Sequence, residues 1–172
     1  MPIAINRGTG AGGANTNATG LAYETLTDLN DMYTRAGDML TFHGYTKQFK
    51  TFKKAELFRK VRRDTSVVPM HGCKQPDESF LSIDDSKLFI IEKKFQQTSG
   101  SVCEKIQTGD AKRYNYRNMF PELEVHYVYC LSEWFASNCK AELDYLSECG
   151  IPIFWGGDST YKKNIVEYIN NS

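Results

Sequence analysis

The sequence lacks the features that define several protein classes. Its 21 basic and 21 acidic side chains cancel, so any binding to a polyanion must come from local clusters of charge. No apolar run approaches the roughly 18 residues of a membrane helix, which predicts no membrane span. Residues 1–17 are rich in glycine, threonine and asparagine and have no apolar core, so we expect an N-terminal arm rather than a signal peptide.

Patterns for metals, disulfides and nucleotides are also missing. The cysteines are odd in number and form no Cys-x-x-Cys pair, which predicts neither structural zinc nor a disulfide framework and favours a reducing cytoplasm. The glycines near the N terminus are followed by no Gly-Lys-Ser/Thr, so they do not form a Walker A loop. The cysteines are Cys73, Cys103, Cys130, Cys139 and Cys149.

Helical and strand patterns alternate along the chain, whose 172 residues suit a single domain. This alternation predicts an α/β fold with a mixed sheet of four to five strands flanked by helices. Residues 42–52 are a further strand or an irregular crossing. The strands are expected at 78–83, 87–95, 125–131 and 151–155, and the helices at 20–35, 55–63, 101–120, 137–149 and 161–171.

Two carboxylates and a lysine stand out near the middle of the chain. Pro76-Asp77 precedes one predicted strand, and Glu92-Lys93-Lys94 ends the next one, after an apolar run. Two close carboxylates repel each other, so they usually need a divalent cation or a shared proton. Oxygen ligands beside a lysine suit Mg²⁺-assisted attack on a phosphodiester.

The turn of the predicted hairpin decides which carboxylate faces Glu92. If residues 84–85 form a two-residue loop, Asp77 lies directly opposite Glu92 on the same face. Opposed Cβ atoms are ~5 Å apart, which is close enough for one metal ion to take both carboxylates. This register makes Asp77 and Glu92 the expected metal ligands.

Other loop lengths leave alternatives. A turn at residues 85–86 puts Asp77 opposite Lys94, still on the same face. A three-residue loop puts Glu78 opposite Glu92 and makes Glu78 the alternative ligand.

Strand alternation assigns the neighbouring side chains. Glu92, Lys94 and Gln96 share one face, and Lys93 points to the other. Lys94 is expected to orient or help deprotonate the attacking water, or to stabilise the developing negative charge. Gln96 is expected to contact substrate or water.

The motif from Pro76 to Lys94 resembles that of the PD-(D/E)XK nuclease superfamily, and specifically its type II restriction endonucleases. Residues 95–101, which lead into a helix, strengthen the resemblance, as does Gly12–Asn17 followed by Gly20–Glu24. The resemblance covers roughly residues 10–135.

This resemblance implies a restriction-endonuclease-like fold over residues 1–172, Mg²⁺ dependence and sequence-specific cleavage of double-stranded DNA. It also implies that Glu24, from the first helix, joins Asp77 and Glu92 at the metal. A homodimer is expected, because one such site cuts one strand and a two-fold protein matches a palindrome. The alternatives are a repair or junction-resolving nuclease of the same superfamily and a non-catalytic DNA-binding module.

Basic residues are concentrated in two stretches that suit DNA phosphates. One lies between residues 47 and 63, and the other follows the second strand of the hairpin. The N-terminal arm could also approach a phosphate through its backbone. The expected DNA contacts are Lys53, Lys54, Arg59, Arg62, Arg63, Lys105, Lys112 and Arg113, with Asn15, Thr16 and Asn17 from the arm.

Overall fold

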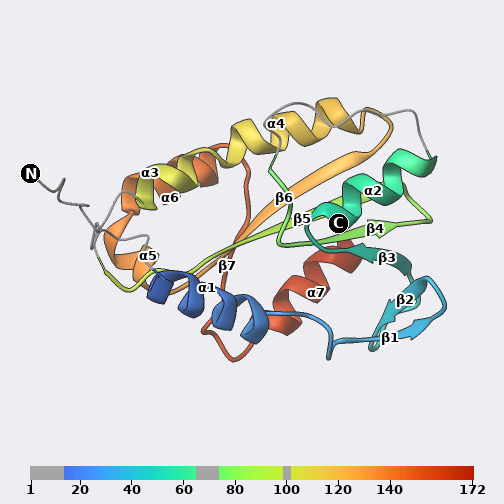
Figure 1. The fold of residues 1–172 in the computed structure, drawn as a ribbon, viewed down its shortest axis with the longest axis horizontal. Helices are drawn as coiled ribbons and strands as arrows, with labels where there is room; N and C mark the ends of the chain where they lie inside the picture. Colours follow the sequence, from blue (N-terminus) through green and yellow to red (C-terminus); the bar gives the residue numbers. More distant parts are fainter. Residues whose placement is uncertain (1–13, 65–73, 99–101) are drawn as a thin grey trace, which may run out of the picture.

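A seven-stranded mixed sheet, with strands in chain order from β1 to β7, runs through the protein (Figure 1). The computed structural model describes residues 14–64, 74–98 and 102–172, with the side chains of 14–19 and 60–64 outside the description. The α/β class and the flanking helices are confirmed, but the sheet is larger than the four to five strands expected. The strands are β1 Tyr33–Ala36, β2 Met39–Phe42, β3 Gln48–Phe52, β4 Glu78–Ser82, β5 Lys87–Lys94, β6 Glu124–Leu131 and β7 Ile153–Trp155.

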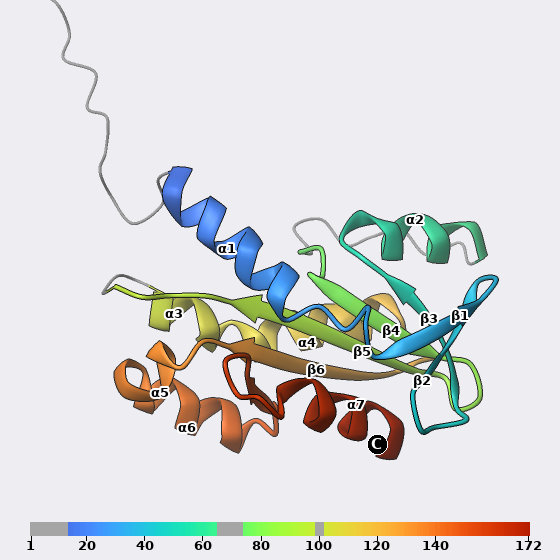
Figure 2. The same cartoon turned by 90° about the horizontal axis from the view of Figure 1, so that it is seen from below.

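Helices cover both faces of the sheet (Figures 1 and 2). One apolar cluster joins one face to helices α2 to α6, and a second joins the other face to α1 and α7. Strands β1 to β5 are antiparallel neighbours, whereas β5, β6 and β7 are parallel. The helices are α1 Ala14–Leu26, α2 Ala55–Asp64, α3 Val102–Gln107, α4 Gly109–Met119, α5 Trp134–Asn138, α6 Lys140–Glu148 and α7 Tyr161–Asn171.

The register of the β4–β5 hairpin follows the two-residue turn at 84–85. Glu78 pairs with Ile91 and Leu81 with Leu88, so one further step puts Asp77 opposite Glu92. The turn at 85–86 and the three-residue loop are therefore excluded.

Alternation along β5 assigns its side chains to the two faces. Leu88 and Ile90 belong to the cluster under α3 and α4, and Phe89 and Ile91 to the cluster under α1 and α7. By the same alternation Glu92 leaves the strand on the α3 and α4 side.

The first helix ends nine residues earlier than the expected Arg35, at Leu26. Side chains after it bond locally instead of continuing the helix: the Thr27 hydroxyl donates to the Tyr23 carbonyl, and Asp28 accepts the backbone N–H of Asn30. The following residues form the β1–β2 hairpin, in which Gly37 has a positive φ of 63°. No hairpin was predicted here, although a Gly-Asp pair such as Gly37-Asp38 often forms a two-residue hairpin turn.

The helix expected over 101–120 is two helices, α3 and α4, separated at Thr108. The Thr108 hydroxyl donates to the Lys105 carbonyl at 2.7 Å, which closes the end of α3. A Cβ on Gly109 would lie 2.7 Å from the ring of Tyr129, so glycine allows the start of α4 to approach β6 closely. The helix expected over 137–149 corresponds mainly to α6, and the short helix α5, which begins at Trp134, was not expected.

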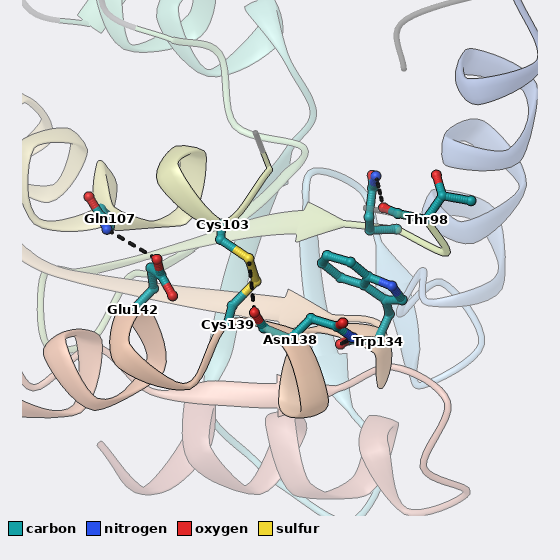
Figure 3. Close-up of a disulfide and its surroundings, with 8 residues drawn as sticks. Thr98, Cys103, Gln107, Trp134, Asn138, Cys139 and Glu142 are labelled. Carbon is teal, nitrogen blue, oxygen red and sulfur yellow. Dashed lines mark hydrogen bonds between the residues drawn. A yellow bond between two sulfur atoms is a disulfide. The ribbon is translucent and has the colours of Figure 1, made fainter. Parts of the chain in front are cut away.

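A disulfide joins Cys103 of α3 to Cys139, between α5 and α6, with a Cα–Cα distance of 5.4 Å (Figure 3). The sequence predicted no disulfide framework, and it did not predict this single disulfide. The two cysteines are 36 residues apart and meet only because α3 packs beside α6, where Gln107 also donates to Glu142. The cysteine pattern consequently gives no support for a reducing cytoplasm, and the compartment stays a prediction. None of the helices in the described ranges is long and apolar enough to cross a membrane.

Candidate active site

Asp77, Glu92 and Lys94 converge where the β4–β5 hairpin opens. The Lys94 ammonium lies 2.7 Å from Glu92 Oε1 and 3.9 Å from Asp77 Oδ2. Asp77 Oδ2 also accepts the backbone N–H of Lys93 at 2.7 Å, which holds the carboxylate against the end of β5. The hairpin alone therefore brings the three residues of the motif together.

Burial and mutual charge perturb these groups. Burial raises the pKa of Asp77, and the nearby Glu92 carboxylate raises it further. Burial also favours a higher pKa for Glu92, but the ammonium groups of Lys94 and Lys112 outweigh it and lower that pKa below its usual range. The two carboxylates thus differ: Glu92 is stabilised as an anion, whereas Asp77 resists ionisation.

Lys112 completes a cluster that the sequence did not predict. Its ammonium group, from α4, lies 2.8 Å from Glu92 Oε1, the same oxygen that Lys94 approaches. The sequence predicted Lys112 only as a DNA contact. Its contact with Glu92 could not be predicted, because spacing along one helix does not show how α4 approaches β5. We call Asp77, Glu92, Lys94 and Lys112 the active-site cluster.

The active-site cluster lines an open pocket of about 660 Å³. Four of the lining residues are lysines and two are carboxylates, so the pocket is locally positive in a chain with no net charge. Such a pocket favours anionic ligands. Its lining residues are Lys74, Gln75, Asp77, Glu92, Lys94, Lys105, Thr108 and Lys112.

Glu24 lines a different pocket from Glu92, and Asp77 belongs to both pockets. The Glu24 carboxylate pairs with Lys54 at 3.3 Å, and both residues line a second pocket of about 410 Å³ that also includes Asp77. In the part of the chain that the structure describes, Glu24, Asp77 and Glu92 do not bring three ligand oxygens within 4.8 Å of one another. The expected set of three metal ligands is therefore not assembled.

Glu78 and Lys93 form a buried ion pair on the opposite face. Their charged atoms are 3.0 Å apart, and their side chains are 1% and 3% exposed. Lys93 also donates to the backbone carbonyl of Glu24, which ties β5 to α1. Asp77 rather than Glu78 thus faces Glu92, and Lys93 points away from the active-site cluster as alternation predicts.

Gln96 is held by its own loop. Its side-chain amide donates to the carbonyl of Thr98 at 2.7 Å, and its backbone exchanges hydrogen bonds with Ser132. These contacts direct the amide toward the loop rather than toward Glu92.

The predicted DNA contacts have different surroundings. Lys53 pairs with Asp28, and Arg113 binds Asp110 and the Cys149 carbonyl at the end of α6. Arg59 on α2 and Lys105 on α3 are exposed, and Lys105 borders the pocket. Arg62 and Arg63 lie on α2, and Asn15, Thr16 and Asn17 on α1, with side chains outside the description.

Two of the three expected metal ligands, Asp77 and Glu92, have the oxygen donors and the proximity that a hard divalent cation needs. Glu92 Oε1 accepts two ammonium groups, at 2.7 and 2.8 Å, and Asp77 has a raised pKa next to it. Two carboxylates, the ligand type that Mg²⁺ prefers, thus lie side by side, and lysines now balance the charge of Glu92. Asp77 and Glu92 are therefore candidate Mg²⁺ ligands, and Glu24 is not brought to the same point.

Comparisons of the chain with protein families, with curated proteins and with solved structures found no match. The resemblance to PD-(D/E)XK nucleases therefore depends on the sequence motif alone.

Proposed function

We propose that the protein is a Mg²⁺-dependent endonuclease of the PD-(D/E)XK type that cuts double-stranded DNA at specific sites. The observation that carries the proposal is the convergence of Asp77, Glu92 and Lys94 at one end of β5. Their pocket has more lysines than carboxylates, as a site for a phosphodiester requires.

Each residue of the motif has a chemical role in this proposal. Asp77 and Glu92 would hold Mg²⁺, which when bound polarises a phosphate and acidifies water. Lys94 is close enough to both carboxylates to orient the attacking water or to balance charge that develops on the phosphate oxygens. The lowered pKa of Glu92 favours its anionic form, whereas burial raises the pKa of Asp77 and makes its ionisation less favourable.

The DNA would approach along the lysines of the pocket. Lys74 and Lys105 lie at its lining with Lys94 and Lys112, and exposed Arg59 adds charge on α2. A two-fold dimer completes the proposal, because one active site cuts one strand and a palindrome presents both strands equivalently.

The test is digestion of mixed plasmid DNA with the full chain and Mg²⁺. Discrete bands are expected, and EDTA should abolish them. Smearing would point to a non-specific nuclease, cutting only of branched or damaged duplexes to a repair or junction-resolving enzyme, and binding without cutting to a non-catalytic module.

Two substitutions test the site within the same assay. Asp77→Ala and Lys94→Ala should each reduce the cleavage rate about 100-fold or more while leaving folding and DNA binding largely intact. Lys163→Ala, at an exposed position on α7, is the control and should cut normally. Normal cutting by either active-site variant would refute the assignment.

A further inference from the structure

Lys112 reaches the active-site cluster from α4, whereas Asp77, Glu92 and Lys94 belong to the β4–β5 hairpin. Its ammonium group donates to Glu92 at 2.8 Å, and its side chain is 17% exposed. It therefore occupies an oxygen that a metal ion would need, at the edge of the open pocket.

Lys112 is also the more easily displaced of the two lysines on Glu92. Lys94 has further partners, the Lys93 carbonyl at 3.2 Å and Asp77 at 3.9 Å, which keep it in place. If Lys112 withdraws, Glu92 remains paired with Lys94. Its buried charge is then not left alone, which would be costly.

The pocket offers Lys112 a second anionic partner when DNA is bound. Lys112 lines this pocket together with Lys74 and Lys105, in the region where the proposed function puts phosphates. A lysine has a long, flexible stem and a compact charge, so its ammonium group can move between two oxygen ligands by rotamer changes alone.

We propose that Lys112 competes with metal ions for Glu92 until a DNA phosphate draws its ammonium group away. This inference rests on the proposed nuclease function and adds a coupling between its two ligands. Because DNA binding removes the competitor, DNA should raise metal affinity, and by thermodynamic reciprocity metal should raise DNA affinity by the same factor.

The experiment measures the two ligands separately. Calorimetric titration with Mg²⁺ alone should show binding about 10- to 100-fold tighter in Lys112→Met, since a charge-assisted hydrogen bond to Glu92 no longer has to be broken. Binding of duplex DNA in EDTA, followed by fluorescence anisotropy, should be weaker in the same variant. A purely structural role for Lys112 would not tighten metal binding.

Two control variants isolate the contact with Glu92. Lys105→Met also removes one positive charge from the pocket. Among the described residues, however, Glu92 forms its ion pairs with Lys94 and Lys112, not with Lys105. Lys105→Met should therefore leave Mg²⁺ affinity nearly unchanged. Lys112→Arg keeps the positive charge and should retain weak Mg²⁺ binding even if Lys112→Met fails to fold.

The outcomes separate this inference from the proposed function. If plasmid DNA is cut but Lys112→Met binds Mg²⁺ no more tightly than the wild type, or no more tightly than Lys105→Met, the competition is rejected and the nuclease stands. If Lys112→Arg bound Mg²⁺ as tightly as a folded Lys112→Met, the competition would also be rejected. If Asp77→Asn does not weaken Mg²⁺ binding and plasmid DNA stays uncut, both proposals fail.

Discussion

Two neighbouring lysines on β5 have opposite environments at the scale of single residues. Lys94 points into the open pocket and is 28% exposed, whereas Lys93 is 3% exposed and paired with Glu78 on the other face. Their environments differ because successive side chains along a strand point to opposite faces of the sheet. One lysine is consequently available for chemistry, while the other holds the sheet to α1 through the Glu24 carbonyl.

The buried pair leads to a prediction about stability. Lys93→Met should lower the free energy of unfolding by about 3–5 kcal/mol, because it leaves the Glu78 carboxylate buried without its counter-charge. Lys94→Met, in a partly exposed position, should cost much less. Urea unfolding measures both. The double variant Glu78→Leu/Lys93→Met should recover most of the loss, and additive losses would show that the two charges are not coupled.

The raised pKa of Asp77 leads to a second prediction at this scale. Its folded pKa lies above its unfolded value of about 3.9, because burial and Glu92 disfavour the anion. The folded state therefore binds the proton more tightly, and stability is lost as the pH rises from the unfolded pKa through the raised one. In EDTA at neutral pH, Asp77→Asn should unfold at a higher temperature than the wild type.

The comparison over pH is the check. The difference in melting temperature between Asp77→Asn and the wild type should disappear once the pH falls below the unfolded pKa of about 3.9. The side chain at this position is then neutral in both proteins. A difference that is constant over pH would mean that the substitution acts through packing instead.

At the scale of elements, the disulfide between Cys103 and Cys139 is the covalent link between α3 and the start of α6. It closes a chain segment of 36 residues, and by the chain-entropy relation such a loop contributes about 3–4 kcal/mol. Figure 3 shows that Gln107 and Glu142 bridge the same two helices beside it.

Removing the link should destabilise the protein without altering the active-site cluster, whose residues lie on the β4–β5 hairpin and α4 rather than on α3 or α6. Cys103→Ser should lower the free energy of unfolding by about 3–4 kcal/mol relative to the oxidised wild type. The wild type treated with dithiothreitol should match this variant, and Cys149→Ser, at a free cysteine, is the control. Equal stability of oxidised and reduced wild type would contradict the prediction.

At the scale of the whole molecule, the charges are separated although they sum to zero. The pocket concentrates four lysines around two carboxylates, so the electrostatic attraction for DNA should be local and sensitive to salt. The logarithm of the DNA association constant should fall linearly with the logarithm of salt concentration, with a slope of about −0.9 per phosphate contact.

Single lysines should contribute measurably to this slope. Lys105→Gln should reduce its magnitude by about one, because it removes one phosphate contact, whereas Lys163→Gln on α7 should not change it. Fluorescence anisotropy with duplex DNA in EDTA at several salt concentrations measures the slope. An equal change in both variants would mean that DNA does not bind at this pocket.

The sequence by itself determined the features that depend on neighbouring residues. The apolar run of β5 and the alternation of side chains predicted the hairpin and favoured the approach of Asp77 to Glu92 and Lys94, while the structure chose the turn at 84–85 among the three that the sequence allowed. Helices α2 and α7 also follow from local pattern. Each of these involves contacts over a few residues or one tight turn, where strand and helix periodicity is decisive.

Only the tertiary structure decided the contacts between distant segments. Lys112 of α4 meets Glu92 of β5, Cys103 meets Cys139 across 36 residues, and Glu24 pairs with Lys54. Residue spacing carries no information about how far a packed helix lies from a strand or about its rotation. That arrangement depends on the packing of the apolar clusters on the two faces of the sheet, a property of the whole chain.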